Sequence, residues 1–516
     1  MSRNFAGVLT CAVMLATATQ ASAQVPPPAA HPATPELQGV TSVGPDVKRL
    51  RYSYGPLVVT PGENLILIGP VTIEKPLYDG YVTRFKPDLL KADGTPPPVD
   101  VIHLHHGVWL NLTGDDATSG TPERLAASGE EKTILELPKD ASGNPIYGYP
   151  VEDTDVWAVN HMLHNQTTEP ETVWITYEID YVSKTSALGQ QLKPVYPVWM
   201  DVCNGEAYPV FDVKRGTGGN GEYTFPNEAP SPKRCSSGRA TGEEWRVPEA
   251  GSLVWTAGHV HPGGLATDLS VKRGTQEQLL FRSEAEYFGN KPPVSWDMAM
   301  TATPNDWRAG LKPGDRLRVT ATYETEIASW YESMGIMIAM FAPGEQGPDP
   351  FVTPPQTSGQ VTHGHLPEND NFGGTPSGLP DPRSLPDGRT LDNRVGIFDF
   401  IYTPGNLGYP AFLGQPPVVR KGTPLRFENA DAAGQIFHTI TACEAPCTNS
   451  TGIGFPLANG PVDFDSGELG YGPTGFTAAA NRYAYALDTN QLQANETYTY
   501  FCRVHPFMRG SFRVVE

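Results

Sequence analysis

The sequence has few histidines, few cysteines and little positive charge for its length. Its 516 residues include 12 His and 6 Cys, and 37 Lys and Arg against 57 Asp and Glu leave a formal net charge of −20. A chain this acidic cannot neutralise the phosphates of a nucleic acid in quantity, so we expect no nucleic-acid partner. The charge favours solubility, although it would also suit cationic partners.

Long apolar runs are missing too. No stretch reaches the roughly 18 uninterrupted apolar residues of a membrane-spanning helix, so we expect no membrane span. The mostly apolar segment 5–16 follows Arg3 and precedes the small-residue sequence Ala21-Ser-Ala23. This arrangement predicts a signal peptide over residues 1–23 and therefore a periplasmic or secreted protein.

Helical periodicity is also scarce, whereas 51 Pro and 53 Gly punctuate the chain. Short alternating runs, of which residues 173–182 are the clearest, recur with turn signals between them and predict an all-β fold built from sandwiches. Changes in composition then divide the chain. We expect a disordered Pro/Ala-rich arm (24–48), a first β-sandwich (49–192), a second β-sandwich (193–342), a Gly/Pro-rich linker or ordered crossing loop (343–390) and a third, Greek-key sandwich (391–516).

The cysteines suit an exported protein. Cys11 would leave with the signal peptide. Cys203 and Cys235 flank a Gly/Pro/Ser-rich stretch, and Cys443 and Cys447 enclose a turn-forming spacer, so each pair is predicted to form a disulfide bond. Cys502 remains unpaired, and metal ligation would explain an odd cysteine.

Eleven of the 12 histidines are clustered, and only His31 stands apart. Imidazole is a ligand for Cu, Zn, Fe and Ni, so the clustering predicts metal sites. The clusters are His103, His105 and His106; His161 and His164; His259 and His261; His363 and His365; and His438 with His505.

The C-terminal cluster indicates copper. Cys502, His505 and Met508 lie between two strand-like runs, and His438 lies upstream. Two imidazoles, a thiolate and a thioether are the ligands of a type 1, or blue, copper that transfers electrons. The segment 391–516 resembles the amicyanin/plastocyanin group of cupredoxins, which implies a cupredoxin fold. No histidine adjoins Cys502, so a trinuclear centre like that of the multicopper oxidases is not expected.

The second sandwich offers another set of ligands. His259 and His261 share one face of a strand, because side chains alternate along it. Met334 could complete a soft His2Met set that holds Cu(I) and leaves a position open for dioxygen. Read separately, the His-x-His pair is also compatible with a solvated strand face, and Met334 with an ordinary core residue.

The first sandwich offers a third set. His105 and His106 are adjacent, and His103 shares a face with His105. A further ligand would come from His161 or His164; these two point to opposite faces of a regular strand, so only one of them should reach the metal. Either residue taken singly is equally compatible with a hydrogen-bonded polar side chain.

Taken in order, residues 50–345 resemble the copper type II ascorbate-dependent monooxygenases, which include peptidylglycine α-hydroxylating and dopamine β-monooxygenases. The resemblance implies two successive β-sandwiches with one copper each. His105, His106 and His164 (or His161) match the first copper set, and His259, His261 and Met334 match the second, where oxygen binding and C–H hydroxylation would occur. With the type 1 site, the resemblance implies one type 1 copper and two mononuclear coppers.

The sequence departs from that family in three ways. Residues 50–345 hold one possible disulfide pair where the family has several, and His103 is an extra histidine that would replace a ligand or support one from behind. Nothing matches the family's peptide-carboxylate contacts, so a peptidylglycine substrate is not implied. His363 and His365 have no counterpart; a metal site, a polar link between domains and simple exposure all remain open.

The functional prediction is therefore an exported copper monooxygenase. It would use O2 and a small or protein electron donor to hydroxylate a small-molecule substrate, with electrons relayed through the blue copper. One alternative is a non-catalytic periplasmic protein that binds copper or transfers electrons. Another is structural zinc, for which closed four-ligand sets would be expected and the soft Met334 is less suited.

Overall fold

The protein is all-β, as the sequence predicts. The computed structural model describes residues 33–65, 68–120, 122–203, 208–236, 238, 240–241, 245–288, 296–368, 379–389, 392–408, 414–434, 436–445, 447, 463–471 and 482–516. The predicted signal peptide lies outside these residues. The helices within the described ranges are single 3-10 turns such as η1 (Pro382–Ser384), and none is long and apolar enough to cross a membrane.

The first region contains two sheets that face each other. The larger follows the order β1-β2-β10-β4-β8-β11 with β7 beside β4, and the smaller follows β3-β9-β5-β6. The strands are β1 (Thr34–Gly44), β2 (Val47–Val59), β3 (Ile68–Thr72), β4 (Gly80–Leu90), β5 (Ile102–Asn111), β6 (Glu123–Ser128), β7 (Leu135–Glu136), β8 (Tyr147–Val151), β9 (Trp157–Asn165), β10 (Glu171–Ser183) and β11 (Lys193–Pro194).

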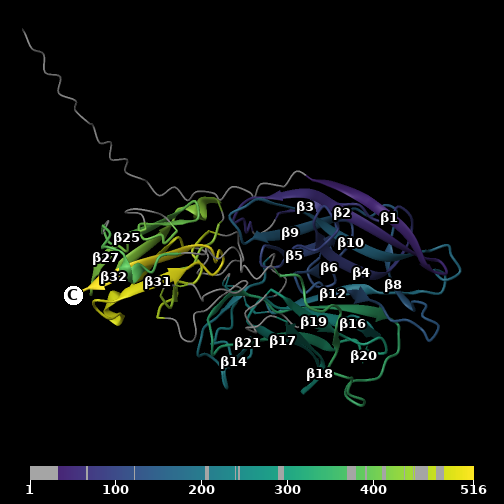
Figure 1. Ribbon diagram of the computed structural model, residues 1–516. Helices are drawn as coiled ribbons and strands as arrows, with labels where there is room; N and C mark the ends of the chain where they lie inside the picture. The colour runs from purple at the N-terminus through teal and green to yellow at the C-terminus, as the bar shows by residue number, and fades with distance from the viewer. Residues whose placement is uncertain are drawn as a thin grey trace, which may run out of the picture.

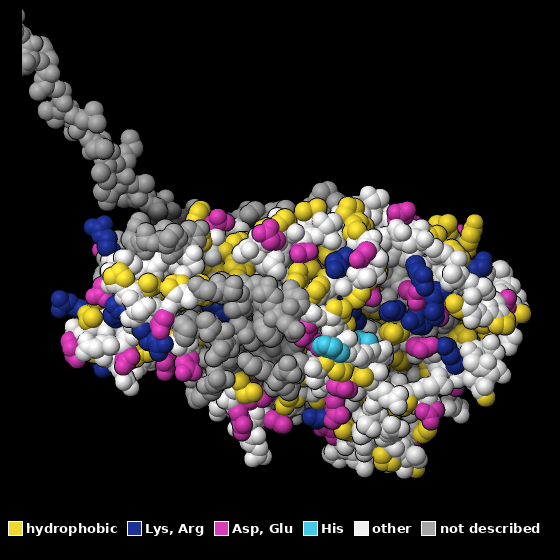
Figure 2. All heavy atoms as spheres, viewed as in Figure 1, with side chains coloured by type: hydrophobic (Ala, Val, Ile, Leu, Met, Phe, Trp, Pro, Cys, Tyr) yellow, Lys and Arg dark blue, Asp and Glu magenta, His cyan; other side chains and the backbone are white. Residues whose placement is uncertain are grey.

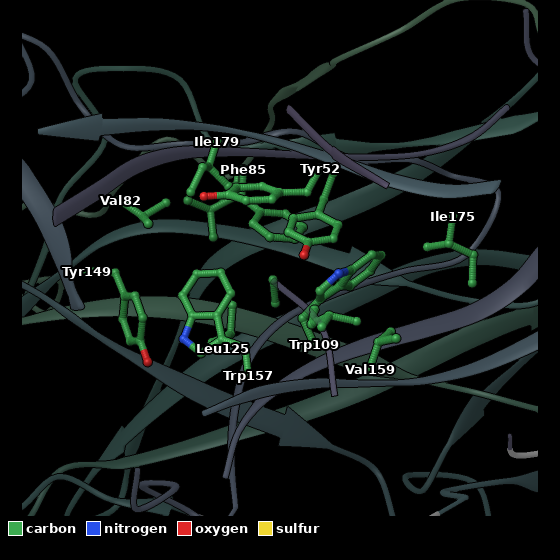
Figure 3. Close-up of a cluster of buried hydrophobic side chains, with 14 of the residues drawn as sticks. Tyr52, Val82, Phe85, Trp109, Leu125, Tyr149, Trp157, Val159, Ile175 and Ile179 are labelled. Atoms are coloured by element: carbon green, nitrogen blue, oxygen red, sulfur yellow. The ribbon is translucent and has the colours of Figure 1, made fainter. Parts of the chain in front are cut away.

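Alternation along the strands builds the core between these sheets. Val173, Ile175, Tyr177 and Ile179 are buried along β10 because every second side chain points inward. The ring of Phe85 on β4 lies 5.1 Å from that of Trp109 on the opposite sheet (Figure 3). The ring of Tyr177 on β10 lies 5.9 Å from Phe85 and 6.2 Å from Trp109. Aromatic contacts thus join the two sheets.

The Pro/Ala-rich arm predicted over residues 24–48 is ordered from residue 33 onward, and its first part lies outside the described residues. Its β1 pairs antiparallel with β2 through a turn at Asp46, whose φ is 62°. Most β1 side chains are exposed, so apolar periodicity gave no sign of a strand. Backbone hydrogen bonding to the edge of the sheet supplies the order instead.

The second region is one long sheet that folds back on itself. Its order is β12-β23-β16-β19-β18-β17-β21-β14, and β21 contacts β12 and β23 from the far end of that order. The strands are β12 (Tyr196–Asp201), β14 (Glu222–Phe225), β16 (Gly251–His259), β17 (Gly264–Arg273), β18 (Gln276–Tyr287), β19 (Met298–Ala302), β21 (Arg316–Glu324) and β23 (Ile336–Pro343). Shorter pieces flank them: β13 (Phe211–Val213), β15 (Trp245–Arg246), β20 (Ala309–Leu311), β22 (Trp330–Ser333) and β24 (Gln360–Val361).

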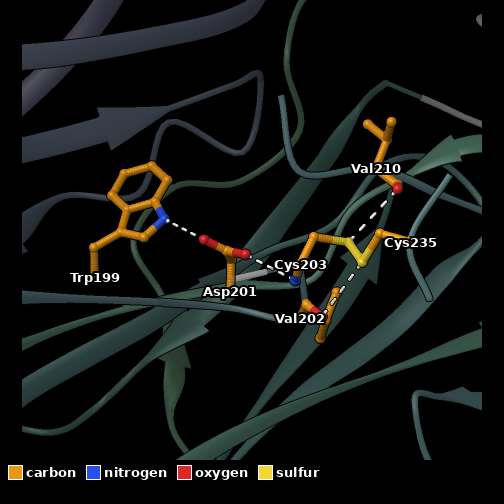
Figure 4. The surroundings of a disulfide bond; sticks show 6 residues. All are labelled: Trp199, Asp201, Val202, Cys203, Val210 and Cys235. Carbon is orange, nitrogen blue, oxygen red and sulfur yellow. Dashed lines mark hydrogen bonds between the residues drawn. A yellow bond between two sulfur atoms is a disulfide. The ribbon is translucent and has the colours of Figure 1, made fainter. Parts of the chain in front are cut away.

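Both predicted disulfides form. Cys203 and Cys235 are joined beside Asp201, whose carboxylate accepts hydrogen bonds from the Cys203 N–H at 2.7 Å and the Trp199 indole at 3.1 Å (Figure 4). Cys443 and Cys447 form the second bond. Within the described part of the chain, Cys502 alone is a free thiol. Such bonds are typical of proteins in oxidising compartments.

The third region holds two four-stranded sheets, ordered β26-β25-β28-β30 and β27-β32-β31-β29. The strands are β25 (Arg394–Phe398), β26 (Ile401–Thr403), β27 (Val418–Arg420), β28 (Leu425–Asn429), β29 (Thr441–Cys443), β30 (Ala484–Leu487), β31 (Thr497–Phe501) and β32 (Arg509–Val515). Phe427 of one sheet and Tyr500 of the other are in ring contact at 5.2 Å, so the sheets share a core. The antiparallel pair β31–β32 encloses the loop that begins at Cys502.

The three regions pack directly on one another (Figure 1). Trp255 of β16 and Met340 of β23 belong to the same buried cluster as the core of the first region. A smaller cluster contains Met162, Met334 and Phe437, one residue from each region. Buried apolar side chains therefore fill the interfaces between the regions.

The described part of the predicted linker is ordered and crosses both sandwiches. We call residues 357–367 the strap. Its Thr357 carbonyl accepts a hydrogen bond from the Arg282 N–H at 2.8 Å, and β24 pairs with β19. Its Thr362 hydroxyl accepts the Ile134 N–H at 3.0 Å, which reaches the first region. The strap therefore links the first two regions by hydrogen bonds.

Candidate metal centres

Three of the residues predicted to bind the type 1 copper lie close together in the third region. His438, Cys502 and His505 are all buried. The Nδ1 atoms of His438 and His505 lie 3.1 Å apart. The Cys502 sulfur lies 3.7 Å from the His438 Nδ1 and 3.8 Å from the His505 Nδ1. Three atoms at these separations surround a point about 2 Å from each, which is the length of metal–imidazole and metal–thiolate bonds.

Local hydrogen bonds hold this group. The Cys502 N–H donates to the Met508 carbonyl at 3.2 Å, and the Met508 N–H donates to the His505 carbonyl at 2.9 Å, so the loop is a closed turn. The sulfur accepts the N–H groups of Thr439 and His505, each at 3.3 Å. Met508 is buried in the same cluster as Cys502.

The partner of His438 fixes the orientation of its ring. Its Nε2 lies 3.0 Å from the Asp431 carboxylate, which leaves Nδ1 directed toward the sulfur. A histidine ligand whose other nitrogen donates to a carboxylate is the usual arrangement at a metal. The donor set therefore fits the predicted type 1 copper.

A second group is assembled from two regions. One ring nitrogen from each of His105, His106 and His261 lies within 4.8 Å of the other two. The His106 Nε2 is 2.8 Å from the His261 Nε2, and the Nδ1 atoms of His105 and His106 are 2.9 Å apart. We call these three residues the interface histidines.

A β-bulge explains how neighbouring residues share this group. On a regular strand His105 and His106 would point to opposite faces. The pairing of β5 with β9 shifts between Leu104 and His106, so His105 is an extra residue in the ladder. A bulge redirects the side chains around it, and here it brings both imidazoles to one place.

The interface histidines are held neutral. Burial, followed by the charges that the neighbouring imidazoles would carry, keeps the pKa of His105, His106 and His261 well below the ordinary value. Neutral imidazoles have a lone pair free to bind a metal. Several unprotonated rings packed together are therefore suited to sharing a cation.

His259 lies next to this group, with its ring 5.3 Å from that of His261, and Met334 contributes to the wall of the cavity that His106 also lines. The His259 Nδ1 is 3.1 Å from the Glu131 carboxylate, and its buried Nε2 has no hydrogen-bond partner among the described residues. His259 and Met334 line the same cavity. A carboxylate orients the His259 ring and leaves its other nitrogen unused, and a thioether contributes to the same cavity wall. These ligand types suit a soft metal such as Cu(I).

Tyr323 positions two predicted ligands through their backbones. Its hydroxyl accepts the N–H groups of His261 and Met334, each at 3.0 Å, and donates to the Met334 carbonyl at 2.7 Å. Glu131 and Tyr323 were not singled out from the sequence. A lone buried carboxylate or tyrosine carries no local pattern by which to find it.

The structure groups the predicted residues differently from the two sets suggested by the family resemblance. His261 lies with His105 and His106, across the boundary between sandwiches. His164 lies outside that group, and its Nε2 donates to the Val504 carbonyl at 2.8 Å. His161, on the same strand, packs its ring edge against Tyr54 and lines the cavity.

His103 lies between these groups. Its ring stacks on Trp296 at 4.4 Å and lies 4.9 Å from the ring of His164 and 6.1 Å from that of His105. Its Nδ1 is 3.1 Å from the Val99 carbonyl. His103 therefore has aromatic contacts toward both His164 and the interface histidines.

His363 and His365 connect the strap to the walls of the site. The His363 Nε2 donates to the Glu131 carbonyl at 2.5 Å, and the His365 Nδ1 contacts the buried Asp297 carboxylate. Asp297, His365 and Glu368 also form a third group with ligand atoms close enough for a metal. Histidine side chains reach the surface at the boundary between the upper and lower parts of the molecule (Figure 2). These contacts support the interpretation of a polar link.

The loop after Cys502 contacts both the first and the second region. The buried Arg503 donates to the Ser329 carbonyl at 2.7 Å and to the Asp465 carboxylate at 2.9 Å. On the other side, the ring of His505 lies 5.8 Å from that of His164. The C-terminal group thus contacts the first region directly through one of its own predicted ligands.

A cavity of about 220 Å³ lies where the first two regions meet. Its wall includes His106, His259 and Met334, together with apolar side chains from both sandwiches. A concave, mainly apolar site with a few convergent polar groups is typical of small-molecule binding. The cavity therefore places a potential ligand beside the metal-binding residues.

Comparison with known proteins does not extend this description. No protein-family model matches the chain, and no curated protein is significantly similar to it.

Proposed function

We propose that the protein is an exported copper monooxygenase that hydroxylates a C–H bond with O2 and an external reductant. The observation that carries the proposal is the cavity whose wall includes His106, His259 and Met334. It supplies a substrate space next to a cluster of neutral imidazoles and a thioether. The complete reaction consumes O2, two electrons and two protons, and it yields the alcohol and water.

The residues of the cavity would divide the work. His105, His106 and His261, together with His259 and Met334, would hold two copper ions, which supply the redox chemistry of oxygen activation. Glu131 accepts from the His259 Nδ1, which would leave the His259 Nε2 to bind the metal. Tyr323 fixes the backbones of His261 and Met334 relative to each other.

The C-terminal group would bring electrons to this site. His505 is adjacent to Val504, whose carbonyl accepts the hydrogen bond of the buried His164. From His164 the ring contacts continue through His103 to His105. The histidines along this path are buried, which suits a type 1 copper that would receive electrons from a small or protein donor and relay them inward.

A non-catalytic copper carrier would need the ligands but not the cavity. The two proposals differ in reductant-driven oxygen consumption, because a carrier shows stoichiometric oxidation without turnover. The cavity, whose wall includes Met334, His106 and His259, favours the proposal of an enzyme over that of a carrier. The disulfides support an oxidising, periplasmic or secreted location.

The decisive variant is Met334→Leu, which removes the thioether while nearly conserving volume. We expect ascorbate-driven oxygen consumption by the copper-loaded protein to be lost, and the blue absorption to be unchanged. Met340→Leu is the matched control, because Met340 is a buried methionine of the neighbouring core. Full oxygen consumption by the Met334→Leu protein would overturn the proposal.

A further inference from the structure

The cavity between the sandwiches has an apolar wall that extends well beyond the predicted ligands. Its apolar side chains come from both regions, which makes the pocket a product of their packing. They include Phe85, Leu110, Leu135, Trp199, Trp255 and Ile336. Such a wall stabilises a ligand by removing apolar surface from water, at about 25 cal/mol per Å².

Arg124 is the single Lys or Arg that contributes to the described part of this wall, and its charge is already paired. Its Nε and Nη2 donate to the two oxygens of Asp116 at 2.8 and 2.9 Å. The guanidinium also lies over the Trp199 ring, 4.6 Å from its centroid. A bidentate pair of this kind satisfies both charges in one fixed geometry.

The Asp116 carboxylate remains ionised in this pair. Burial alone would raise its pKa, but the hydrogen bonds and charge of Arg124 lower it to about 2. The pair therefore has no net charge at neutral pH. An anionic ligand would have to displace Asp116 to gain a partner.

Glu131, the single acidic residue of the described wall, is also engaged. Its two oxygens accept the Gly129 N–H at 2.9 and 3.0 Å, and Oε1 lies 3.1 Å from the His259 Nδ1. A cationic ligand would have to compete with these donors. Among the Lys, Arg, Asp and Glu side chains of the described wall, neither sign of charge on a ligand therefore finds an unpaired partner.

We propose that the cavity selects an uncharged, largely apolar substrate and excludes ions of the same shape that are poor copper ligands, such as sulfonates and quaternary ammonium compounds. The physical reason is that a buried charge without a partner loses its hydration and recovers little. The inference rests on the proposed function for the chemistry that follows binding. Binding itself needs only the cavity.

The test compares three probes that share one body and differ in charge: butylbenzene, 4-phenylbutane-1-sulfonate and trimethyl(4-phenylbutyl)ammonium. Sulfonate and quaternary ammonium groups are poor copper ligands, so direct ligation does not obscure the comparison. Binding to the full-length, copper-loaded protein without reductant is followed by calorimetry and by tryptophan fluorescence. We expect butylbenzene to bind at least about tenfold more tightly than either ion.

Two variants locate the effect. Ala127→Phe places a ring in the cavity, because Ala127 is part of its wall, and should abolish binding of butylbenzene. Asp116→Asn leaves the Arg124 charge without its carboxylate, and should raise the affinity for the sulfonate by about tenfold relative to the wild-type protein.

The inference would be overturned if an ion bound the wild-type protein as tightly as butylbenzene, or if Ala127→Phe left binding intact. The outcomes separate this inference from the proposed function. Selective binding of butylbenzene without any oxygen consumption would refute the enzyme and keep the cavity assignment. Turnover of a charged substrate would support the enzyme and refute the selectivity of the cavity.

Discussion

The two metal-binding groups are built in opposite ways. His438, Cys502 and His505 belong to one region, and two of them lie on one short turn closed by its own hydrogen bonds. The interface histidines come from two sandwiches and meet only because those sandwiches pack together. We therefore expect the local site to survive changes elsewhere in the chain, whereas the assembled site should depend on the whole interface.

The largest expected effect comes from the local group. Cys502→Ser removes the thiolate and should eliminate the blue absorption entirely, because that colour requires the copper–thiolate bond. Copper bound at the interface histidines should remain, since no ligand there is changed. Metal analysis and visible spectra of the loaded protein measure both. Loss of all copper would contradict the independence of the two groups.

The complementary change affects the assembled group. His261→Ala removes the ligand that the second sandwich contributes, and should weaken copper binding there by at least about 100-fold while the blue band persists. Competitive copper titration measures the affinity. Met340→Leu is the control, because this buried side chain belongs to the neighbouring core and to none of the metal-binding groups. Equal copper binding by both variants would argue against an interface site.

The connection between the groups is tested at His164. His164→Leu removes the ring and its hydrogen bond to the Val504 carbonyl. We expect re-oxidation of the reduced blue copper by oxygen to slow by at least about tenfold, which corresponds to about 1.4 kcal/mol in the barrier. Stopped-flow absorption follows the blue band directly.

A control and an opposite outcome sharpen that test. His164→Phe retains an aromatic ring without the hydrogen bond, so a rate between those of the wild-type and His164→Leu proteins would separate the two contributions. If His164→Leu also lost one equivalent of non-blue copper, His164 would be a ligand, as the family resemblance implies.

The smallest effect is expected in the strap. The ring of His365 is largely exposed, and the buried Asp297 carboxylate that its Nδ1 contacts also accepts the Leu366 N–H, so Asp297 keeps a hydrogen bond when the ring is removed. His365→Ala should lower the free energy of unfolding by about 0.5–1 kcal/mol without changing copper content. Denaturant titration measures this change. A large loss of interface copper in this variant would instead make the strap part of the metal site.

The sequence predicted the local group more completely than the assembled one. The order of Cys502, His505 and Met508 is a pattern within one loop, and the loop geometry follows from nearby residues. The meeting of His261 with His105 and His106 depends on a bulge at His105 and on the packing of two sandwiches. Neither has a sequence signal within a short window.

The fold shows the same division. Alternation along β10 predicted its buried face, and the cysteine spacing predicted both disulfides. The order of β1 was missed because its side chains are exposed and its backbone supplies the pairing. A polar link at His363 and His365 was one of three interpretations left open, and their contacts support it. The other contacts of the strap were not predicted, because Gly- and Pro-rich composition indicates a crossing segment but not what it crosses.

The most direct test of the account is the copper content of the fully loaded, full-length protein, measured together with its visible and EPR spectra. The account predicts one blue copper and two non-blue coppers per chain. One blue copper with no other bound copper would contradict it, because the histidines at the junction of the two sandwiches would then not be a metal centre.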